Sequence, residues 1–142
     1  MKLSMHKAAL ALALSSLASI ANATTVTVTL QNVSPTASIS VSSGNRVYFP
    51  LVVGPNQTQT FTVDFNNTTS EFDITYRSVK GEACRFQAGH KSIRVSPTVV
   101  TANFTQSATS VGTGVPLCNI NLTPRTYQAP FDYRLNIMMG SY

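Results

Sequence analysis

The chain has 142 residues, of which 43% are hydrophobic and 11% are charged, and its formal net charge is +5. This length suits a single domain with a modest hydrophobic core. Val, Ile, Leu, Phe and Tyr recur throughout the chain after residue 23, which excludes an intrinsically disordered protein.

The first 23 residues have the three parts of a secretory signal peptide. Lys2 and Lys7 precede the apolar run AALALALSSLASI, and the small residues of 21–23 (ANA) form a cleavage site. The run is shorter than the roughly 20 apolar residues that cross a bilayer, and the alternative is a buried helix of the domain. We expect a signal peptide at 1–23, a mature domain at 24–142 without a transmembrane segment, and a periplasmic or secreted protein.

After this leader, apolar residues recur at every second position, which is the period of a β-strand. The alternation is clear at 26–30, 61–65, 72–76, 93–95, 100–104, 118–122 and 133–139, and it is weaker at 37–42. The apolar run 46–53 predicts a further strand. No segment after residue 23 has the 3.6-residue period of an amphipathic helix.

Turn-forming residues separate these strands at 43–45, 54–56, 66–67, 80–81, 89–90, 112–114 and 123–124. Eight or nine short strands at this spacing predict an antiparallel β-sandwich of immunoglobulin-like type, with a closed barrel as the alternative. The chain has no Trp, so the antibody pattern itself is absent. The stretch 106–116 lacks alternation, and we interpret it as either a mobile binding loop or a plain connector.

The first strand carries its apolar face on Val26, Val28 and Leu30. Because the strand is short, Thr-rich and near the terminus, we expect it to be an edge strand of its own sandwich. It also resembles the donor strand of fimbrial subunits, which are exported β-sandwich proteins with one disulfide. That resemblance implies that this face fills the core of a neighbouring subunit.

Two features depart from the fimbrial pattern. The two cysteines of this chain lie late in the mature sequence, whereas those of the family lie early, and Tyr142 is the last residue instead of the one before it. The resemblance is therefore limited to general class, and we do not assign the chain to this family.

Cys84 and Cys118 are the two cysteines of the chain. An isolated pair in an exported protein forms a disulfide in the simplest case, and closing this loop is worth about 4 kcal/mol in the chain-entropy model. The alternative is a metal site, but two thiols and His90 are too few for a four-ligand zinc site. We expect a disulfide and neither a metal nor another cofactor.

No set of residues indicates catalysis. The acids after residue 23 show no pattern that predicts two carboxylates flanking a cleft, and G-x-S-x-G is absent; the acids are Asp64, Glu71, Asp73, Glu82 and Asp132. His90 is the one candidate histidine base after residue 23. We expect a protein that is not an enzyme, and a small secreted hydrolase is the third interpretation.

Basic residues gather between positions 77 and 94. By alternation, Arg77, Arg85 and Arg94 point outward from neighbouring strands, while Lys80, His90 and Lys91 lie at turns. If these strands form consecutive hairpins, the six residues make a basic patch that attracts an anionic glycan, lipopolysaccharide or an acidic protein surface. The alternative is a solvated sheet face, and we expect no binding to nucleic acid.

These observations favour a non-enzymatic binding or surface-interaction module. The alternative is a structural subunit of an envelope or fimbria-like assembly, joined by strand donation. Neither the ligand nor the oligomeric state follows from the sequence.

Overall fold

The computed structural model describes residues 23–67 and 69–142 and contains nine strands and no helix in these ranges. The strands are β1 (Thr24–Asn32), β2 (Ile39–Gly44), β3 (Val52–Val53), β4 (Thr58–Phe65), β5 (Thr69–Ser78), β6 (Ala83–Arg94), β7 (Val100–Ser110), β8 (Leu117–Pro124) and β9 (Tyr133–Gly140). No helix long and apolar enough to cross a membrane occurs in the described part of the chain.

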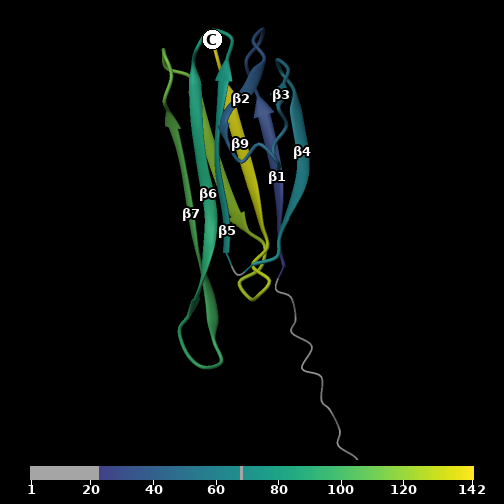
Figure 1. The fold of residues 1–142 in the computed structure, drawn as a ribbon, viewed down its shortest axis with the longest axis vertical. Helices are drawn as coiled ribbons and strands as arrows, with labels where there is room; N and C mark the ends of the chain where they lie inside the picture. The colour runs from purple at the N-terminus through teal and green to yellow at the C-terminus, as the bar shows by residue number, and fades with distance from the viewer. Residues whose placement is uncertain (1–22, 68) are drawn as a thin grey trace, which may run out of the picture.

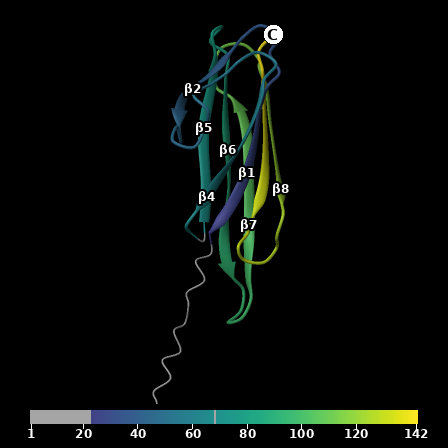
Figure 2. The ribbon, with the colours of Figure 1, turned by 90° about the vertical axis from the view of Figure 1, so that its right-hand side faces the viewer.

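The strands form two sheets that pack face to face as a β-sandwich (Figures 1 and 2). One sheet has the order β4-β1-β9-β8 and the other the order β3-β2-β5-β6-β7. β1 runs parallel to β9, and the other strand pairs are antiparallel. The expected all-β architecture with eight or nine strands is confirmed.

The core lies between the two sheets and follows from the period-two alternation. Tyr76, Phe86 and Leu135 are among its largest fully buried side chains. Phe49 projects into the same core from a loop and makes edge-to-face contacts with Phe61 and Phe72, at 5.4 Å between ring centroids in each case. Burying a side chain of this size stabilises the fold by about 1.5–3 kcal/mol.

The first strand is an interior strand, and the expectation of an edge strand was wrong. β1 pairs with β4 on one side and with β9 on the other. Its apolar residues, Val26, Val28 and Leu30, are each 0% exposed and belong to the core of their own sandwich. In this conformation, the face that strand donation would place in the core of a neighbouring subunit lies in the core of its own chain.

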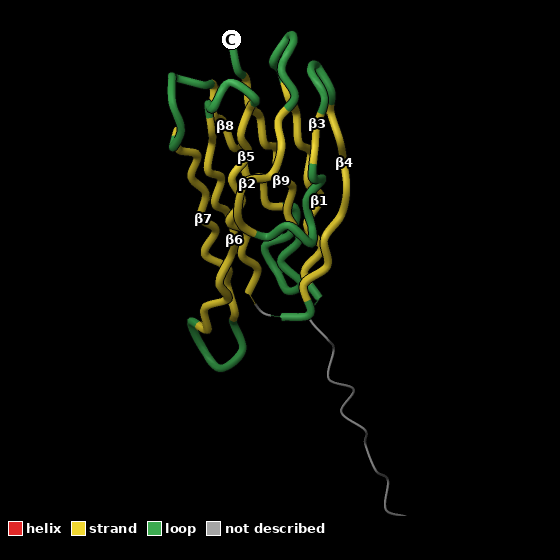
Figure 3. Tube along the Cα trace, turned by 45° about the horizontal axis from the view of Figure 1, so that its top comes forward, coloured by secondary structure: helices red, strands yellow, loops and turns green. Residues whose placement is uncertain are grey.

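Three further boundaries differ from the sequence-based expectation. The predicted strand 46–53 is strand only at β3, because Phe49 turns into the core and the Pro50 carbonyl accepts a 2.6 Å hydrogen bond from Tyr76. The predicted turn at 89–90 lies inside the unbroken β6, and β7 extends to Ser110, so the expected loop 106–116 is shorter (Figure 3).

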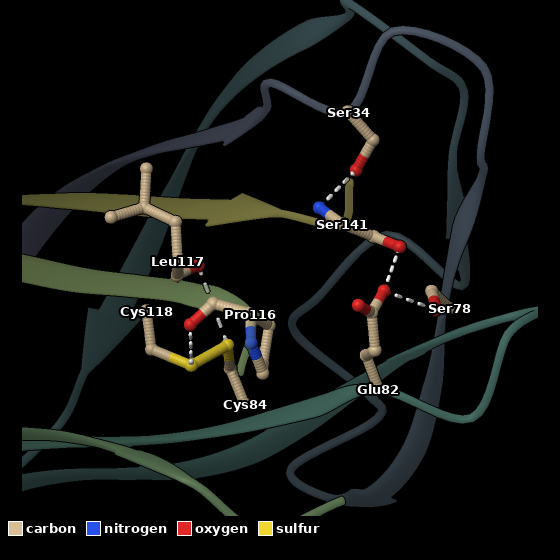
Figure 4. The surroundings of a disulfide bond; sticks show 8 residues. All are labelled: Ser34, Ser78, Glu82, Cys84, Pro116, Leu117, Cys118 and Ser141. Atoms are coloured by element: carbon tan, nitrogen blue, oxygen red, sulfur yellow. Dashed lines mark hydrogen bonds between the residues drawn. A yellow bond between two sulfur atoms is a disulfide. The ribbon is translucent and has the colours of Figure 1, made fainter. Parts of the chain in front are cut away.

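The predicted disulfide is confirmed, and it joins the two sheets because Cys84 lies in β6 and Cys118 in β8 (Figure 4). The Cα atoms of the pair are 5.6 Å apart, which is ordinary disulfide spacing. The C-terminal end is fixed nearby: Ser141 donates its backbone N–H to Ser34 Oγ at 2.7 Å and its hydroxyl to Glu82.

Candidate binding face

The residues predicted to form one basic patch lie in three different surroundings. They are Arg77, Lys80, Arg85, His90, Lys91 and Arg94. Four of them lie on or beside the outer face of the five-stranded sheet, which is the side turned away from the core; His90 is buried in the core, and Arg94 lines a pocket at the base of the sandwich. The patch is therefore not a single continuous surface.

The cations of the outer face are themselves spread out. Arg77 and Lys80 are near the turn between β5 and β6, where Arg77 donates to the Gly81 carbonyl at 3.0 Å. Arg85 and Lys91 both belong to β6 and are about 20 Å apart along the strand. At that distance, exposed charges act separately at physiological salt.

Arg85 is neutralised by Asp73 on the neighbouring strand. The guanidinium makes two hydrogen bonds to this carboxylate, at 2.9 and 2.5 Å. The bonds to Arg85 lower the pKa of Asp73 below its usual 3.8, and Gln87 adds a third hydrogen bond at 3.2 Å. The Arg85 charge is consequently engaged within the protein and does not face an external anion alone.

Arg94 is directed away from this face, because it alternates in phase with the inward-facing Phe86 and His90. It lines a pocket of about 250 Å³ together with Thr24, Pro130 and other residues at the base of the sandwich. Its guanidinium donates to the Pro97 carbonyl at 2.9 Å.

His90 belongs to the core. It is 1% exposed and is surrounded by the rings of Phe104, Phe131 and Tyr133, with centroid distances of 5.7–6.0 Å. Its Nδ1 lies 2.7 Å from the Ser70 hydroxyl, which lies 2.8 Å from the Tyr133 hydroxyl. Burial lowers the pKa of His90 below its usual 6.5, so the ring is neutral at pH 7.

This Ser–His contact differs from the arrangement of a serine hydrolase. In a triad the third group orients the histidine, whereas here Tyr133 contacts the serine. Nε2 of His90 is buried and has no hydrogen-bond partner among the described residues. Ser70 is itself only 4% exposed. The cluster therefore has the geometry of a packed core in which the hydroxyl groups of Ser70 and Tyr133 are hydrogen-bonded.

A groove of about 510 Å³ crosses β5, β6 and β7 where β6 carries Gly89. On the outer face Gly89 lies between Glu71 of β5 and Thr105 of β7, and Lys91 follows two residues later. Glycine has no side chain to fill this position. A Cβ here would lie 2.2 Å from the backbone oxygen of Ser70, so the close approach of β5 and β6 requires a glycine.

Polar side chains form the walls of the groove. Among them are Glu71, Gln87, Lys91, Asn103 and Ser107. The amide of Gln87 is held at both ends, because its Nε2 donates to Asp73 and its Oε1 accepts from Ser107 at 3.4 Å. Lys91 and Glu71 are exposed and form no ion pair within the described residues. The Gln87 side chain is thus held in place at one end of the groove. At the other end, the charges of Glu71 and Lys91 are not paired within the described residues.

Sequence reasoning missed this groove because it treated Gly89 as a turn residue. An isolated glycine within an alternating strand also marks a close approach of two backbones, and this second meaning applies here. The polar residues of 103–107 did not indicate the groove either, because the expected strand ended at 104 and the expected loop began at 106, whereas β7 continues to Ser110.

No group of three or more His, Cys, Asp or Glu residues that could hold a metal ion occurs in residues 23–67 and 69–142. No protein-family model matches the chain, and no curated protein is significantly similar to it. A functional assignment consequently depends on the geometry of the molecule itself.

Proposed function

We propose that the chain is an exported, non-enzymatic binding module of immunoglobulin-like type that holds a segment of an acidic glycan in the Gly89 groove. The observation that carries the proposal is a hollow lined by polar side chains on the five-stranded sheet, built around a glycine that the backbone packing requires. The predicted signal peptide at 1–23 and the disulfide between Cys84 and Cys118 suit an oxidising compartment outside the cytoplasm.

The chemistry of the walls suits a ligand rich in hydroxyl groups. Amide and hydroxyl side chains, such as those of Gln87, Asn103 and Ser107, both donate and accept hydrogen bonds. The Glu71 carboxylate accepts bonds from sugar hydroxyls, and the Lys91 ammonium attracts a carboxylate or phosphate. Asp73 is close by but is neutralised by Arg85, so it does not repel an anionic ligand.

Of the cations in the predicted basic patch, this proposal assigns ligand binding to Lys91, which lines the groove. The Lys91→Gln variant keeps a polar side chain, one atom shorter, and removes its charge. We expect it to bind oligogalacturonate about two- to fivefold more weakly than the unchanged protein, as the loss of one exposed ionic contact predicts. Isothermal titration calorimetry with this oligosaccharide measures the effect.

The matched control is Arg134→Gln, which removes an exposed cation from the outer face of the other sheet, beside Thr123 of β8. The control variant should bind as the unchanged protein does. Equal weakening by both variants would indicate attraction by net charge alone, and absence of oligogalacturonate binding would contradict the proposal.

Two further ligands distinguish the possible sources of the anion. Lipopolysaccharide carries phosphate on a glycan, and its binding should depend on Lys91 in the same way. Poly-glutamate represents an acidic protein surface, and binding to it that exceeds binding to both glycans would overturn the choice of a glycan. A double change of Arg77 and Arg94 to Ala, which keeps Arg85 paired with Asp73, should affect glycan binding less than Lys91→Gln does, because these two arginines do not line the groove.

A further inference from the structure

The edge strands of the two sheets differ in how well they are protected from pairing with a strand of another chain. β3 has two residues, which is too short to attract another strand. β7 and β8 lie at neighbouring edges of the two sheets, and Gln106 of β7 accepts the backbone N–H of Leu122 of β8. β4, by contrast, is an eight-residue edge strand at the outside of its sheet (Figure 1).

The register of β4 shows which of its backbone groups are free. Asn32 donates its N–H to the Gln57 carbonyl at 2.9 Å, so these residues form a hydrogen-bonded pair next to the β1–β4 ladder. Antiparallel ladders alternate such pairs with non-bonded ones. The odd-numbered residues of β4 therefore bond to β1, and the free N–H and C=O groups belong to Thr58, Thr60, Thr62 and Asp64.

β4 lacks most of the devices that keep edge strands apart. Its sequence, TQTFTVDF, contains no Lys, Arg or Pro, and its pairing with β1 has no bulge. The single charge, that of Asp64, accepts a 2.7 Å hydrogen bond from the Thr25 hydroxyl. A second strand can therefore approach this edge without meeting a repulsive side chain.

We propose that two copies of the chain associate through antiparallel pairing of β4 with β4 of the second copy, which joins their four-stranded sheets into one. A register centred on Phe61 uses all the free groups of the edge. It places Thr58 opposite Asp64 of the second copy and Thr60 opposite its Thr62. No like charges face each other, so the edge is complementary to itself, and Thr–Thr pairs of this kind stabilise sheets.

The same register gives the partly exposed apolar groups a partner. Phe61 is half-buried at the edge and would face Phe61 of the second copy at the two-fold axis. Val52 lies beside β4, where its carbonyl accepts a 3.4 Å hydrogen bond from the Gln59 side chain. Val52 is 56% exposed. Its neighbour Leu51 is 64% exposed. These apolar side chains favour a second copy over a hydrophilic partner at this edge.

Sedimentation velocity over a range of concentrations tests the proposal on the protein expressed with its own N-terminal segment. We expect a monomer–dimer equilibrium. Thr58→Asp, which opposes Asp64 of the second copy, should weaken the dimer about tenfold because the like-charge contact occurs twice, and Thr58→Lys should strengthen it. Asn119→Asp on β8, at the opposite edge of the same sheet, is the control and should leave the dimer unchanged.

A second variant tests the backbone contact. Thr60→Pro removes an N–H group that the single chain does not use, so the fold should be retained while dimerisation is lost. A protein that stays monomeric at every concentration would overturn the proposal. So would a dimer that responds equally to both charges at position 58, since such a dimer would use another surface or register.

Discussion

The burial of His90 makes the stability of the protein depend on pH in a window where few other groups titrate. Burial lowers the pKa of this residue in the folded state, while the unfolded chain keeps the usual 6.5. Between the two values the unfolded chain binds more protons than the folded one, so the free energy of unfolding falls as the pH falls below 6.5. The side chains around the ring, those of Ser70, Phe104, Phe131 and Tyr133, carry no charge that would hold an imidazolium.

The size of the effect follows from this linkage. A single group that binds its proton in the unfolded state alone lowers the free energy of unfolding by about 1.4 kcal/mol per pH unit. Between pH 7.5 and 5.5 the loss should therefore not exceed about 1.4 kcal/mol. The Asp73 carboxylate, whose pKa is lowered, loses its contribution only as the pH falls below about 5, so it does not affect this interval.

Urea denaturation at pH 7.5, 6.5 and 5.5 measures this loss, and His90→Phe is the control variant. Phenylalanine fits among the surrounding rings, removes the unpartnered Nε2 and leaves Ser70 bonded to Tyr133. We expect a flat profile for the variant over the same interval. An unchanged protein with a flat profile, or a variant with the same slope as the unchanged protein, would refute the assignment of this pH dependence to His90.

Three other substitutions test contacts that the structure specifies, each through the free energy of unfolding in urea. Asn32→Asp should lower it by at least about 2 kcal/mol, because the buried amide nitrogen donates to three carbonyls that a carboxylate would repel. Gly89→Ala should lower it by about 2 kcal/mol or more, whereas Gly54→Ala should cost less because its Cβ meets a movable side chain. Replacing Cys84 and Cys118 together by Ser should lower the free energy of unfolding by about 2–5 kcal/mol. An unchanged value would contradict the expected stabilisation by the disulfide.

The sequence predicted the class of fold because period-two alternation reports which face of a strand is buried. It placed Val26, Val28 and Leu30 correctly on an inward face, and the structure buries all three. It could not distinguish an edge strand from an interior one, since that distinction depends on hydrogen-bonded neighbours and leaves no trace in the alternation. β1 has the same pattern that it would have at an edge, yet it has strands on both sides.

The basic patch was predicted less well for a related reason. Treating 89–90 as a turn made residues 93–95 a separate strand, so Arg94 received the wrong parity. In the continuous β6 it shares the phase of His90, on the side opposite Arg85. The pairing of Arg85 with Asp73 depends on the register of β5 against β6, which places Asp73 opposite Gln87. One misread glycine thus changed the predicted face of one arginine and hid the groove.

Gly89 links the candidate site to the stability of the fold. Because β5 and β6 approach closely at this residue, a larger side chain cannot fill the groove without forcing the two strands apart. The groove is therefore a consequence of how the sheet packs and needs no separate loop to form it. Directly beside it, on the opposite face of the same strand, His90 fills the core with an aromatic ring. Just below pH 6.5 the proton that lowers the stability is bound by the unfolded chain and not by the folded ring. Glycan binding by the folded protein should therefore stay unchanged as the stability begins to fall.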